Sequence, residues 1–333
     1  MRKKAVDICP PFLLRKLKMS DFIYSDTNKH YHTQSCYLKK RFGRKTVKVS
    51  LNGNFTCPNR DGTIGRGGCI FCSASGSGDF AASRNLSVEE QVLQAKRLVS
   101  SKIKDGKKIR YIAYFQNFTS TYGDEDSLLK KYIAATGFED VAGLSVGTRP
   151  DCISEKMLGY LAGLSEKKYL SVELGFQSSK EESVRYMRRM YENSVFCECV
   201  KRIKEKAPGI HVVAHLIFGL PGETAEDMMN SVRYVLESGI DGIKISILHV
   251  LEGTDLAKDF RGGAFKCLEK NEYFELLGNA LKIIPKDIVI HRLTGDGSKK
   301  ILVAPLWTGN KRDVLNSMMR YFDEKNIVQG ISC

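Results

Sequence analysis

Short apolar runs rich in β-branched residues alternate with longer amphipathic stretches from residue 45 onward. Such runs are typical of buried strands, whereas apolar residues at intervals of three and four are typical of helices that cover a sheet. The alternation predicts six strand–helix units, with strands at 45–53, 110–118, 141–149, 169–178, 210–220 and 242–251. Helices are expected at 88–104, 126–138, 154–165, 179–206 and 224–239. The pattern indicates a parallel α/β sheet, and because six units are too few for an eight-stranded barrel, we expect a partial barrel or an open sheet.

The two ends of the chain depart from this rhythm. Residues 1–44 are expected to form an N-terminal extension, residues 45–251 the core, and residues 252–333 a small C-terminal α+β extension packed on the core. The C-terminal extension contains expected helices near 270–284 and 311–325, a short strand at 288–293 and an apolar segment at 301–307.

No stretch of the chain approaches the roughly 18 consecutive apolar residues that a membrane-spanning helix needs. The N-terminus is positively charged, but Pro10 and Pro11 interrupt the segment after it, and the apolar run 12–14 is too short for a signal-peptide core. We therefore expect a cytoplasmic protein without membrane contact.

The charge balance of the chain bears on its partners. Of its 333 residues 42% are hydrophobic, which is an ordinary globular composition. Its 52 Lys and Arg residues against 38 Asp and Glu give a formal net charge of +14. Such a balance favours a polyanionic partner such as nucleic acid, although a generally basic surface without such a partner is the alternative. The basic stretches 39–44, 102–110 and 185–189 are candidates for a binding patch or for solvated faces.

Three of the ten cysteines, Cys57, Cys69 and Cys72, are grouped directly after the first expected strand. Such grouping in a reducing compartment favours metal binding or catalysis over disulfides. Thiolates suit iron–sulfur clusters and zinc, but structural zinc needs four ligands and no fourth is obvious nearby. Three thiolates on a four-iron cluster would leave one iron open for a substrate. The spacing therefore favours a cluster, with zinc or unligated thiols as the alternatives.

This loop and the six-unit pattern resemble the radical S-adenosylmethionine superfamily. More narrowly, they resemble its YhcC/YtqA-like branch, a relative of the catalytic subunit of elongator. The resemblance extends from about residue 42 to 312 and rests on FGRKTVKVSLNGNFTCPNRDGTIGRGGCIFC, YFQNFTSTY, VGTRPDCI, ELGFQS, HLIFGLPGET, IKISILHVLEGTDLA and HRLTGDG…LVAPLW. It implies a partial (β/α)6 TIM-like barrel and a [4Fe–4S] cluster held by Cys57, Cys69 and Cys72. It also implies S-adenosylmethionine at the open iron, on the edge where the strands end.

The resemblance further implies contacts to S-adenosylmethionine. Phe71 matches an aromatic residue whose backbone contacts adenine, although packing is its simpler role. Gln177 and His215 match positions that contact the ribose hydroxyls, and Arg189 matches an arginine that pairs with the methionyl carboxylate. Taken by themselves, a histidine in an apolar strand is more often a core residue, and Arg189 beside Arg188 fits a solvated basic face.

Two positions depart from the family pattern. Relatives carry a glycine-rich turn after the second strand that meets the methionyl amino group, whereas this chain has YFQNFTSTY. Gln116 or Thr119 is therefore expected to make that contact. Relatives often carry a glutamate where this chain has Gly147, and Glu173 is the candidate substitute.

The family's reaction is reductive cleavage of S-adenosylmethionine to methionine and a 5′-deoxyadenosyl radical, which takes a hydrogen atom from the substrate. Because the cofactors carry this chemistry, no protein group is assigned a catalytic role. The elongator relation implies a tRNA substrate, with carboxymethylaminomethyl converted to aminomethyl at C5 of the wobble uridine. An electron donor such as flavodoxin or ferredoxin is expected.

Two alternatives remain at this point. One is radical chemistry on a small molecule, and the other is a scaffold that binds zinc or an iron–sulfur cluster without catalysis. The oligomeric state is left open. The other cysteines considered are expected to be packing residues or incidental thiols, and they are Cys152, Cys197, Cys199, Cys267 and Cys333.

Overall fold

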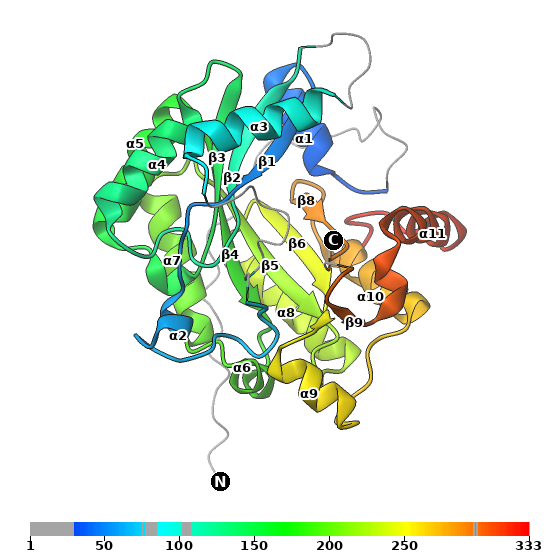
Figure 1. The fold of residues 1–333 in the computed structure, drawn as a ribbon. Coiled ribbons are helices and arrows are strands. Elements are labelled where there is room, and N and C mark those ends of the chain that lie inside the picture. Colours follow the sequence, from blue (N-terminus) through cyan, green and yellow to red (C-terminus); the bar gives the residue numbers. More distant parts are fainter. Residues whose placement is uncertain are drawn as a thin grey trace.

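The sheet at the centre of the molecule curls into a half-barrel of seven parallel strands (Figure 1). The computed structural model describes residues 30–74, 76, 85–101, 108–295, 297 and 299–332. Cys333, most of the expected N-terminal extension and residues 102–107 of one basic stretch lie outside the described residues. The strands lie in the order β1 (Thr46–Leu51), β2 (Arg110–Phe115), β3 (Val141–Thr148), β4 (Tyr169–Gln177), β5 (His211–Phe218), β6 (Gly242–Ile247) and β8 (Val289–Arg292). The expected partial barrel is confirmed, with one more strand than expected.

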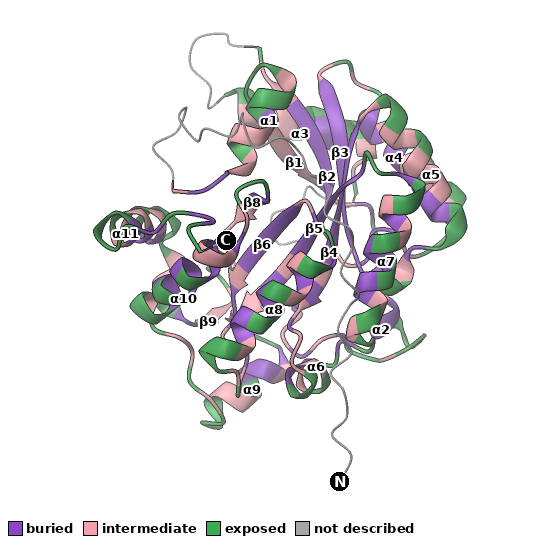
Figure 2. Ribbon diagram, turned by 180° about the vertical axis from the view of Figure 1, so that it is seen from behind, coloured by how far each residue is buried: buried purple, intermediate pink, exposed green. Residues whose placement is uncertain are grey.

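Helices cover the outer face of the sheet and turn their buried residues toward it (Figure 2). They are α3 (Val88–Ser100), α4 (Glu125–Thr136), α5 (Glu155–Lys167), α7 (Asn193–Lys206), α8 (Ala225–Glu237) and α10 (Lys270–Ile283). Helix α1 (Gln34–Phe42) lies against the edge strands β1 and β8, and α11 (Lys311–Glu324) packs on α10. Short helices lie nearer the ends of the strands, namely α2 (Pro58–Asp61), η1 (Pro150–Cys152), α6 (Glu181–Tyr186), α9 (Asp255–Arg261) and η2 (Leu306–Gly309). Among the described helices, none is both long and apolar enough to cross a membrane.

Polar side chains at the helix starts determine where the covering helices begin. Ser87 forms a capping box with Glu90 at the start of α3, and Thr224 does the same with Asp227 at α8. Ser154 caps α5 with its hydroxyl. Each cap satisfies backbone N–H groups that have no partner within the helix, so these boundaries are set by local sequence.

The C-terminal part of the chain completes the sheet. Strand β8 pairs in parallel with β6, so a segment beyond residue 251 supplies the seventh strand. The prediction of a single strand at 242–251 is wrong in its second half, because β6 ends at Ile247. The residues after it form a separate strand, β7 (Val250–Leu251), which pairs antiparallel with β9 (Leu302–Ala304). The core boundary at 251 therefore stays a prediction.

The two faces of β4 show how the sheet separates apolar from polar side chains. Leu170, Val172 and Leu174 are buried in the apolar core that includes the covering helices. Ser171 and Glu173 alternate with them and therefore lie on the opposite face, inside the half-barrel. The interior of the barrel consequently contains buried polar groups, while the apolar core lies outside it.

Candidate active site at the carboxyl ends of the strands

The cysteine loop leaves β1 at the carboxyl edge of the sheet. The carbonyl of Cys57 accepts a hydrogen bond of 2.8 Å from the backbone of Arg60 at the start of α2, and the backbone N–H of Cys72 donates to Cys69 at 2.9 Å. Gly68 has a φ of 84°, a conformation in which side chains are strained, and its N–H donates to the Asn59 carbonyl. The loop is therefore folded on its own backbone, with all three cysteines at the same edge.

Neighbouring loops hold the cysteine loop in place. The Asn59 amide donates to the carbonyl of Arg188 at 2.6 Å and lies 3.6 Å from the Cys69 sulfur. Arg60 donates to the carbonyl of Ser73 at 2.8 Å. The backbone N–H of Ile70 donates to the residue directly after α6, at 3.2 Å. These contacts fix the loop against the segment between α6 and α7.

The cysteine sulfurs influence one another. Burial, then the neighbouring thiol of Cys72 and then that of Cys57, raises the pKa of Cys69 to about 12. Binding a metal centre would therefore release a proton from this thiol, because the ligand is the thiolate. Among the described residues, no three His, Cys, Asp or Glu side chains converge on a single metal ion. A multi-iron cluster needs wider spacing, because each thiolate binds a different iron.

Backbone strain is concentrated at this edge. Six described residues other than glycine have a positive φ, and five of them lie in the loops after β1 and β2, at the last residue of β4 or between α6 and α7. These five are Asn54, Phe118, Gln177, Arg188 and Met190. Strained conformations cluster at functional sites, because the surrounding structure must hold them for a reason. The strain therefore marks this edge as the site independently of the cysteines.

The loop after β2 joins the cysteine loop. The backbone N–H of Thr119 donates to the carbonyl of Thr56 at 3.2 Å, and Thr119 is buried. Gln116 comes directly after β2, and its Cα would lie 3.6 Å from a Cβ added at Gly147 on the next strand. Both residues expected to replace the family's glycine-rich turn are therefore at the cysteine edge. Their contact to S-adenosylmethionine stays a prediction.

Gln177 and Phe71 also lie at this edge. Gln177 ends β4 with a φ of 67°, and its amide folds back so closely that a Cβ at Gly175 would lie 2.6 Å from it. Phe71 is half-buried and packs against a small apolar cluster whose buried members include Met187 and Leu248. Its packing role is thus observed, while its expected contact to adenine stays a prediction.

Arg189 is placed differently from the expectation. Its guanidinium is buried and uses all its N–H groups within the protein, on the carbonyls of Phe176, Ser178 and Tyr191 and on the Asn193 side chain. These bonds join the end of β4 to the turn before α7, which is a structural role. Pairing with a methionyl carboxylate would require Arg189 to give up one of these bonds.

Glu173 and His215 belong to a buried polar cluster inside the barrel. Glu173 is fully buried and accepts hydrogen bonds from side chains of five other strands. These donors are Lys48 (β1), Tyr114 (β2, 2.6 Å), Ser145 (β3, 3.0 Å), His215 (β5, 2.7 Å) and Lys244 (β6, 2.9 Å). Both carboxylate oxygens of Glu173 already accept hydrogen bonds from protein side chains. Glu173 could therefore take the place of the family's glutamate only if a contact to S-adenosylmethionine replaced one of these hydrogen bonds.

The pKa values in this cluster show which groups are charged. Burial opposes ionisation of Glu173, but Lys244 and Lys48 hold its pKa well below the usual range. Burial and then Lys244 lower the pKa of His215 to about 4, so its ring is neutral at pH 7. Burial lowers the pKa of Lys244 to about 8, against the stabilising effect of Glu173. At neutral pH Glu173 is thus a carboxylate and Lys244 an ammonium, and Lys48 adds a second cation through its ion pair with Glu173.

Comparison with known proteins identifies the family. The profile of the Radical SAM superfamily matches residues 60–235, and that of the Radical_SAM C-terminal domain matches residues 240–324. The chain belongs to the radical SAM superfamily. It is 40% identical over 314 residues to the uncharacterized protein YtqA of Bacillus subtilis (strain 168), covering 94% of this chain and 96% of that protein.

Two other radical SAM matches are more distant. A tRNA uridine(34) acetyltransferase of Methanocaldococcus infernus is 28% identical over 193 residues, which are 57% of this chain and 34% of that protein. The solved structure of Methanocaldococcus infernus Elp3 with an N-terminal deletion has a TM-score of 0.63 at 20% identity, covering 85% of this chain and 64% of that one. The structural likeness shows that the fold is shared.

As a radical SAM enzyme, the protein uses a [4Fe–4S] cluster and S-adenosylmethionine. The cysteine loop fits this cluster, because Cys57, Cys69 and Cys72 bring three soft donors to one strained edge of the barrel. The resemblance inferred from the sequence is confirmed. Sequence reasoning missed Lys48, Tyr114, Ser145 and Lys244, whose only signal is a polar residue at an inward position of a strand.

Proposed function

We propose that this radical SAM enzyme reductively cleaves S-adenosylmethionine to modify tRNA. The proposed reaction converts carboxymethylaminomethyl to aminomethyl at C5 of the wobble uridine and releases the carboxymethyl carbons as glyoxylate. The N–CH2 carbon would lose one hydrogen atom to the 5′-deoxyadenosyl radical and one electron, which replaces the electron used in cleavage, and water would hydrolyse the resulting C=N bond. The observation that carries the RNA assignment is the similarity to a tRNA uridine(34) acetyltransferase over 193 residues. The cysteine loop lies at the carboxyl edge of the barrel, where the strands end (Figure 1).

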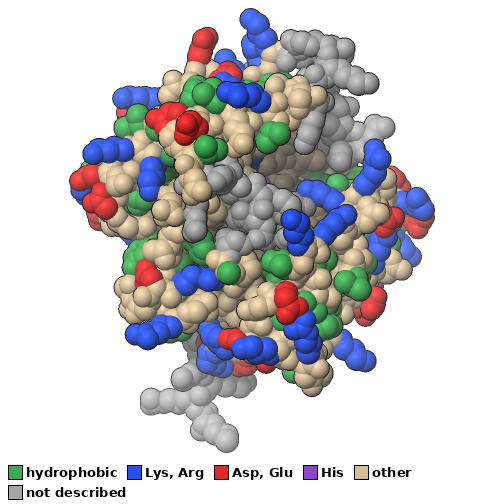
Figure 3. Space-filling model, viewed as in Figure 1, with side chains coloured by type: hydrophobic (Ala, Val, Ile, Leu, Met, Phe, Trp, Pro, Cys, Tyr) green, Lys and Arg blue, Asp and Glu red, His purple; other side chains and the backbone are tan. Residues whose placement is uncertain are grey.

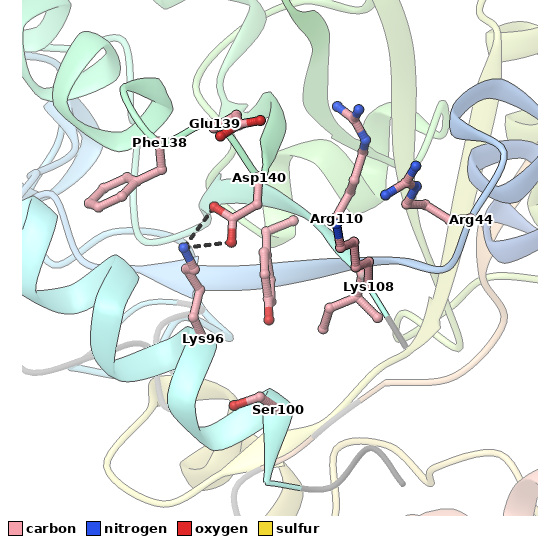
Figure 4. A pocket seen from close by; sticks show the side chains of 10 residues that line it. Arg44, Lys96, Ser100, Lys108, Arg110, Phe138, Glu139 and Asp140 are labelled. Atoms are coloured by element: carbon pink, nitrogen blue, oxygen red, sulfur yellow. Dashed lines mark hydrogen bonds and ion pairs between the residues drawn. The ribbon is translucent and has the colours of Figure 1, made fainter. Parts of the chain in front are cut away.

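A basic cleft supports contact with RNA. It has a volume of about 730 Å³ and lies at the amino ends of β1 and β2. Figure 4 shows Arg44, Lys108 and Arg110 at one end of this cleft, while Lys96 points to Asp140 at the other end, with an ion pair of 2.6 Å. In the described part of the chain, these first three cations form no ion pair. Parts of the basic stretches 39–44 and 102–110 therefore meet and leave charge available for phosphate groups.

The third basic stretch, 185–189, is engaged with acidic neighbours. Arg188 pairs with Asp255 at 2.7 Å, and Arg185 lies 3.2 Å from Glu182. On the face drawn in Figure 3, Lys and Arg side chains at the lower rim are mixed with Asp and Glu. This stretch thus resembles an ordinary charged surface, and the cleft is the stronger candidate for contact with RNA.

This chain's own residues have separate proposed roles. Cys57, Cys69 and Cys72 would hold the cluster, which together with S-adenosylmethionine supplies hydrogen-atom abstraction when bound. Gln116 and Gln177 are proposed to orient S-adenosylmethionine at the ends of β2 and β4. An electron donor of the flavodoxin or ferredoxin type and a tRNA are the proposed partners.

The test is an anaerobic assay with two readouts. The reconstituted, dithionite-reduced protein is incubated with S-adenosylmethionine and tRNA that carries carboxymethylaminomethyluridine. We expect 5′-deoxyadenosine by chromatography and aminomethyluridine by mass spectrometry of digested tRNA. Cys57→Ala should abolish both products, whereas Cys36→Ala, which removes a half-buried thiol on α1, should retain them.

The outcomes separate the alternatives. Production of 5′-deoxyadenosine that requires Cys57 but leaves the tRNA unchanged would contradict the RNA assignment and direct the search to small molecules. Absence of 5′-deoxyadenosine from a protein with full iron content would contradict catalysis and favour a metal-binding scaffold.

A further inference from the structure

Two lysines from opposite sides of the half-barrel meet at one buried carboxylate. Lys48 is on β1 at one edge of the sheet, and Lys244 is on β6 near the other. Both ammonium groups contact Glu173 on the central strand β4. The curl of the sheet therefore gathers charge at mid-depth in the barrel. Glu173 lies four residues before Gln177, the last residue of β4, and at a rise of about 3.3 Å per residue this places it ~13 Å below the carboxyl edge.

The charges in this cluster do not balance. Glu173 supplies one negative charge, while Lys48 and Lys244 supply two positive charges, and His215 and Tyr114 are neutral at pH 7. Among the described residues, the neighbouring strands add no anion to these contacts. Arg292 on β8 lowers the pKa of Lys244, and His211 and His291 have pKa values below the usual range. A buried ionic cluster with excess positive charge is unfavourable unless an anion completes it.

Two of the hydrogen-bond donors are more accessible than the carboxylate they contact. The side chain of Glu173 is 0% exposed, whereas that of Lys48 is 17% exposed and that of His215 is 27% exposed. Lys48 makes one hydrogen bond among the described residues, so two of its three N–H groups have no acceptor there. A molecule that reaches the exposed atoms of these two side chains would therefore meet donors before it met the carboxylate.

We propose that Lys48 and Lys244 form a carboxylate-binding site inside the barrel, and that its ligand is the terminal carboxylate of the substrate side chain. This inference rests on the proposed function, in which the substrate carries a carboxymethyl group and the product does not. An RNA backbone phosphate is linked on both sides and cannot enter a closed interior as an end group. A carboxylate at the tip of a base substituent can, so this site distinguishes substrate from product.

The experiment measures binding with three anticodon stem-loops that differ at one base. They carry carboxymethylaminomethyluridine, aminomethyluridine or uridine, and fluorescence anisotropy gives each dissociation constant with the reconstituted enzyme. We expect the carboxylated RNA to bind about tenfold more tightly than the aminomethyl RNA, the scale of one charge-assisted hydrogen bond. Lys48→Met should reduce this preference to less than about threefold, a loss of most of that interaction.

Controls test charge separately from folding. Lys270→Met removes an ammonium that pairs with Asp313 at 2.6 Å, outside both the barrel and the basic cleft, and should keep the preference. Lys48→Arg keeps the charge and should retain part of it, and iron content reports whether each variant folds. Equal binding of the three RNAs by the wild-type enzyme would overturn the proposal even if no variant folds. So would a Lys48→Met enzyme that folds and keeps the full preference.

The same preparations distinguish failure of the site from failure of the proposed function. Conversion of the carboxylated nucleoside without any binding preference would leave the function intact and remove the site. If tRNA is not converted, calorimetry with sarcosine, which carries the same terminal carboxylate, against dimethylamine tests the site directly. Heat of binding for sarcosine that disappears in Lys48→Met would support the site, and its absence in the wild type would overturn it.

Discussion

The barrel interior and the basic cleft both gather cations, but they place them in different surroundings. Inside the barrel, Lys48 and Lys244 are largely withdrawn from water and bonded to Glu173. At the amino edge, Arg44 and Lys108 are exposed and form no ion pair among the described residues. Buried charges interact strongly with one well-placed group, whereas exposed charges act on any nearby anion and are screened by salt. The interior is therefore suited to selecting a chemical group, and the cleft to attracting a polyanion.

The largest expected effect is the removal of the interior carboxylate. Glu173→Gln would leave two lysines buried without their counter-charge, and we expect the free energy of unfolding to fall by about 3–5 kcal/mol. Denaturant titration of the wild type and the variant measures this difference. A variant as stable as the wild type would show that the two lysines do not depend on Glu173 for a counter-charge. It would then contradict the distinction between buried, paired charges in the barrel and exposed charges in the cleft.

Reversing charge in the cleft should affect RNA binding without this loss of stability. Arg44→Glu combined with Arg110→Glu should weaken tRNA binding on the order of 10- to 100-fold and make the salt dependence shallower, because phosphate contacts are lost. Anisotropy at several salt concentrations measures both. The matched control is Arg320→Glu combined with Lys325→Glu near the end of α11, and an equal loss there would indicate a general charge effect rather than a site.

The interior should also respond to pH through Lys244. Its pKa is about 8 in the folded protein against an ordinary value of 10.5, so above pH 8 the folded state binds fewer protons than the unfolded state. The free energy of unfolding of the wild type should then rise relative to Lys244→Met between pH 8 and 10.5, by at most about 1.4 kcal/mol per pH unit. Parallel pH profiles of the two proteins would show that this lysine is not desolvated.

The smallest expected effect is at the ion pair beside the cleft. Asp140→Asn removes the partner of Lys96 at a site where the Asp140 side chain is 41% exposed. The expected change in the free energy of unfolding is about 0–1 kcal/mol, because water already solvates both groups. Denaturant titration alongside Glu173→Gln measures it, and an effect as large as that of Glu173→Gln would contradict the distinction between buried and exposed charge.

Local sequence determined much of the fold. The apolar strands and amphipathic helices predicted the parallel half-barrel, because burial on one or both faces leaves a periodic signal in the chain. Residues such as Ser87 and Thr224 set helix starts through contacts within three residues. The cysteine loop could also be recognised from the sequence as a metal-binding candidate, since its three cysteines lie within a span of sixteen residues. Its resemblance to a known family predicted the cofactors.

Only the tertiary structure decided how distant residues combine. It brought β8 beside β6 as a seventh strand, turned β7 away to pair with β9, and used the donors of Arg189 within the protein. It also gathered Lys48, Tyr114 and Lys244 around Glu173 from separate strands. A single inward lysine in an apolar strand carries no sign of its partner, because that partner is fixed by strand order and the curl of the sheet rather than by sequence distance.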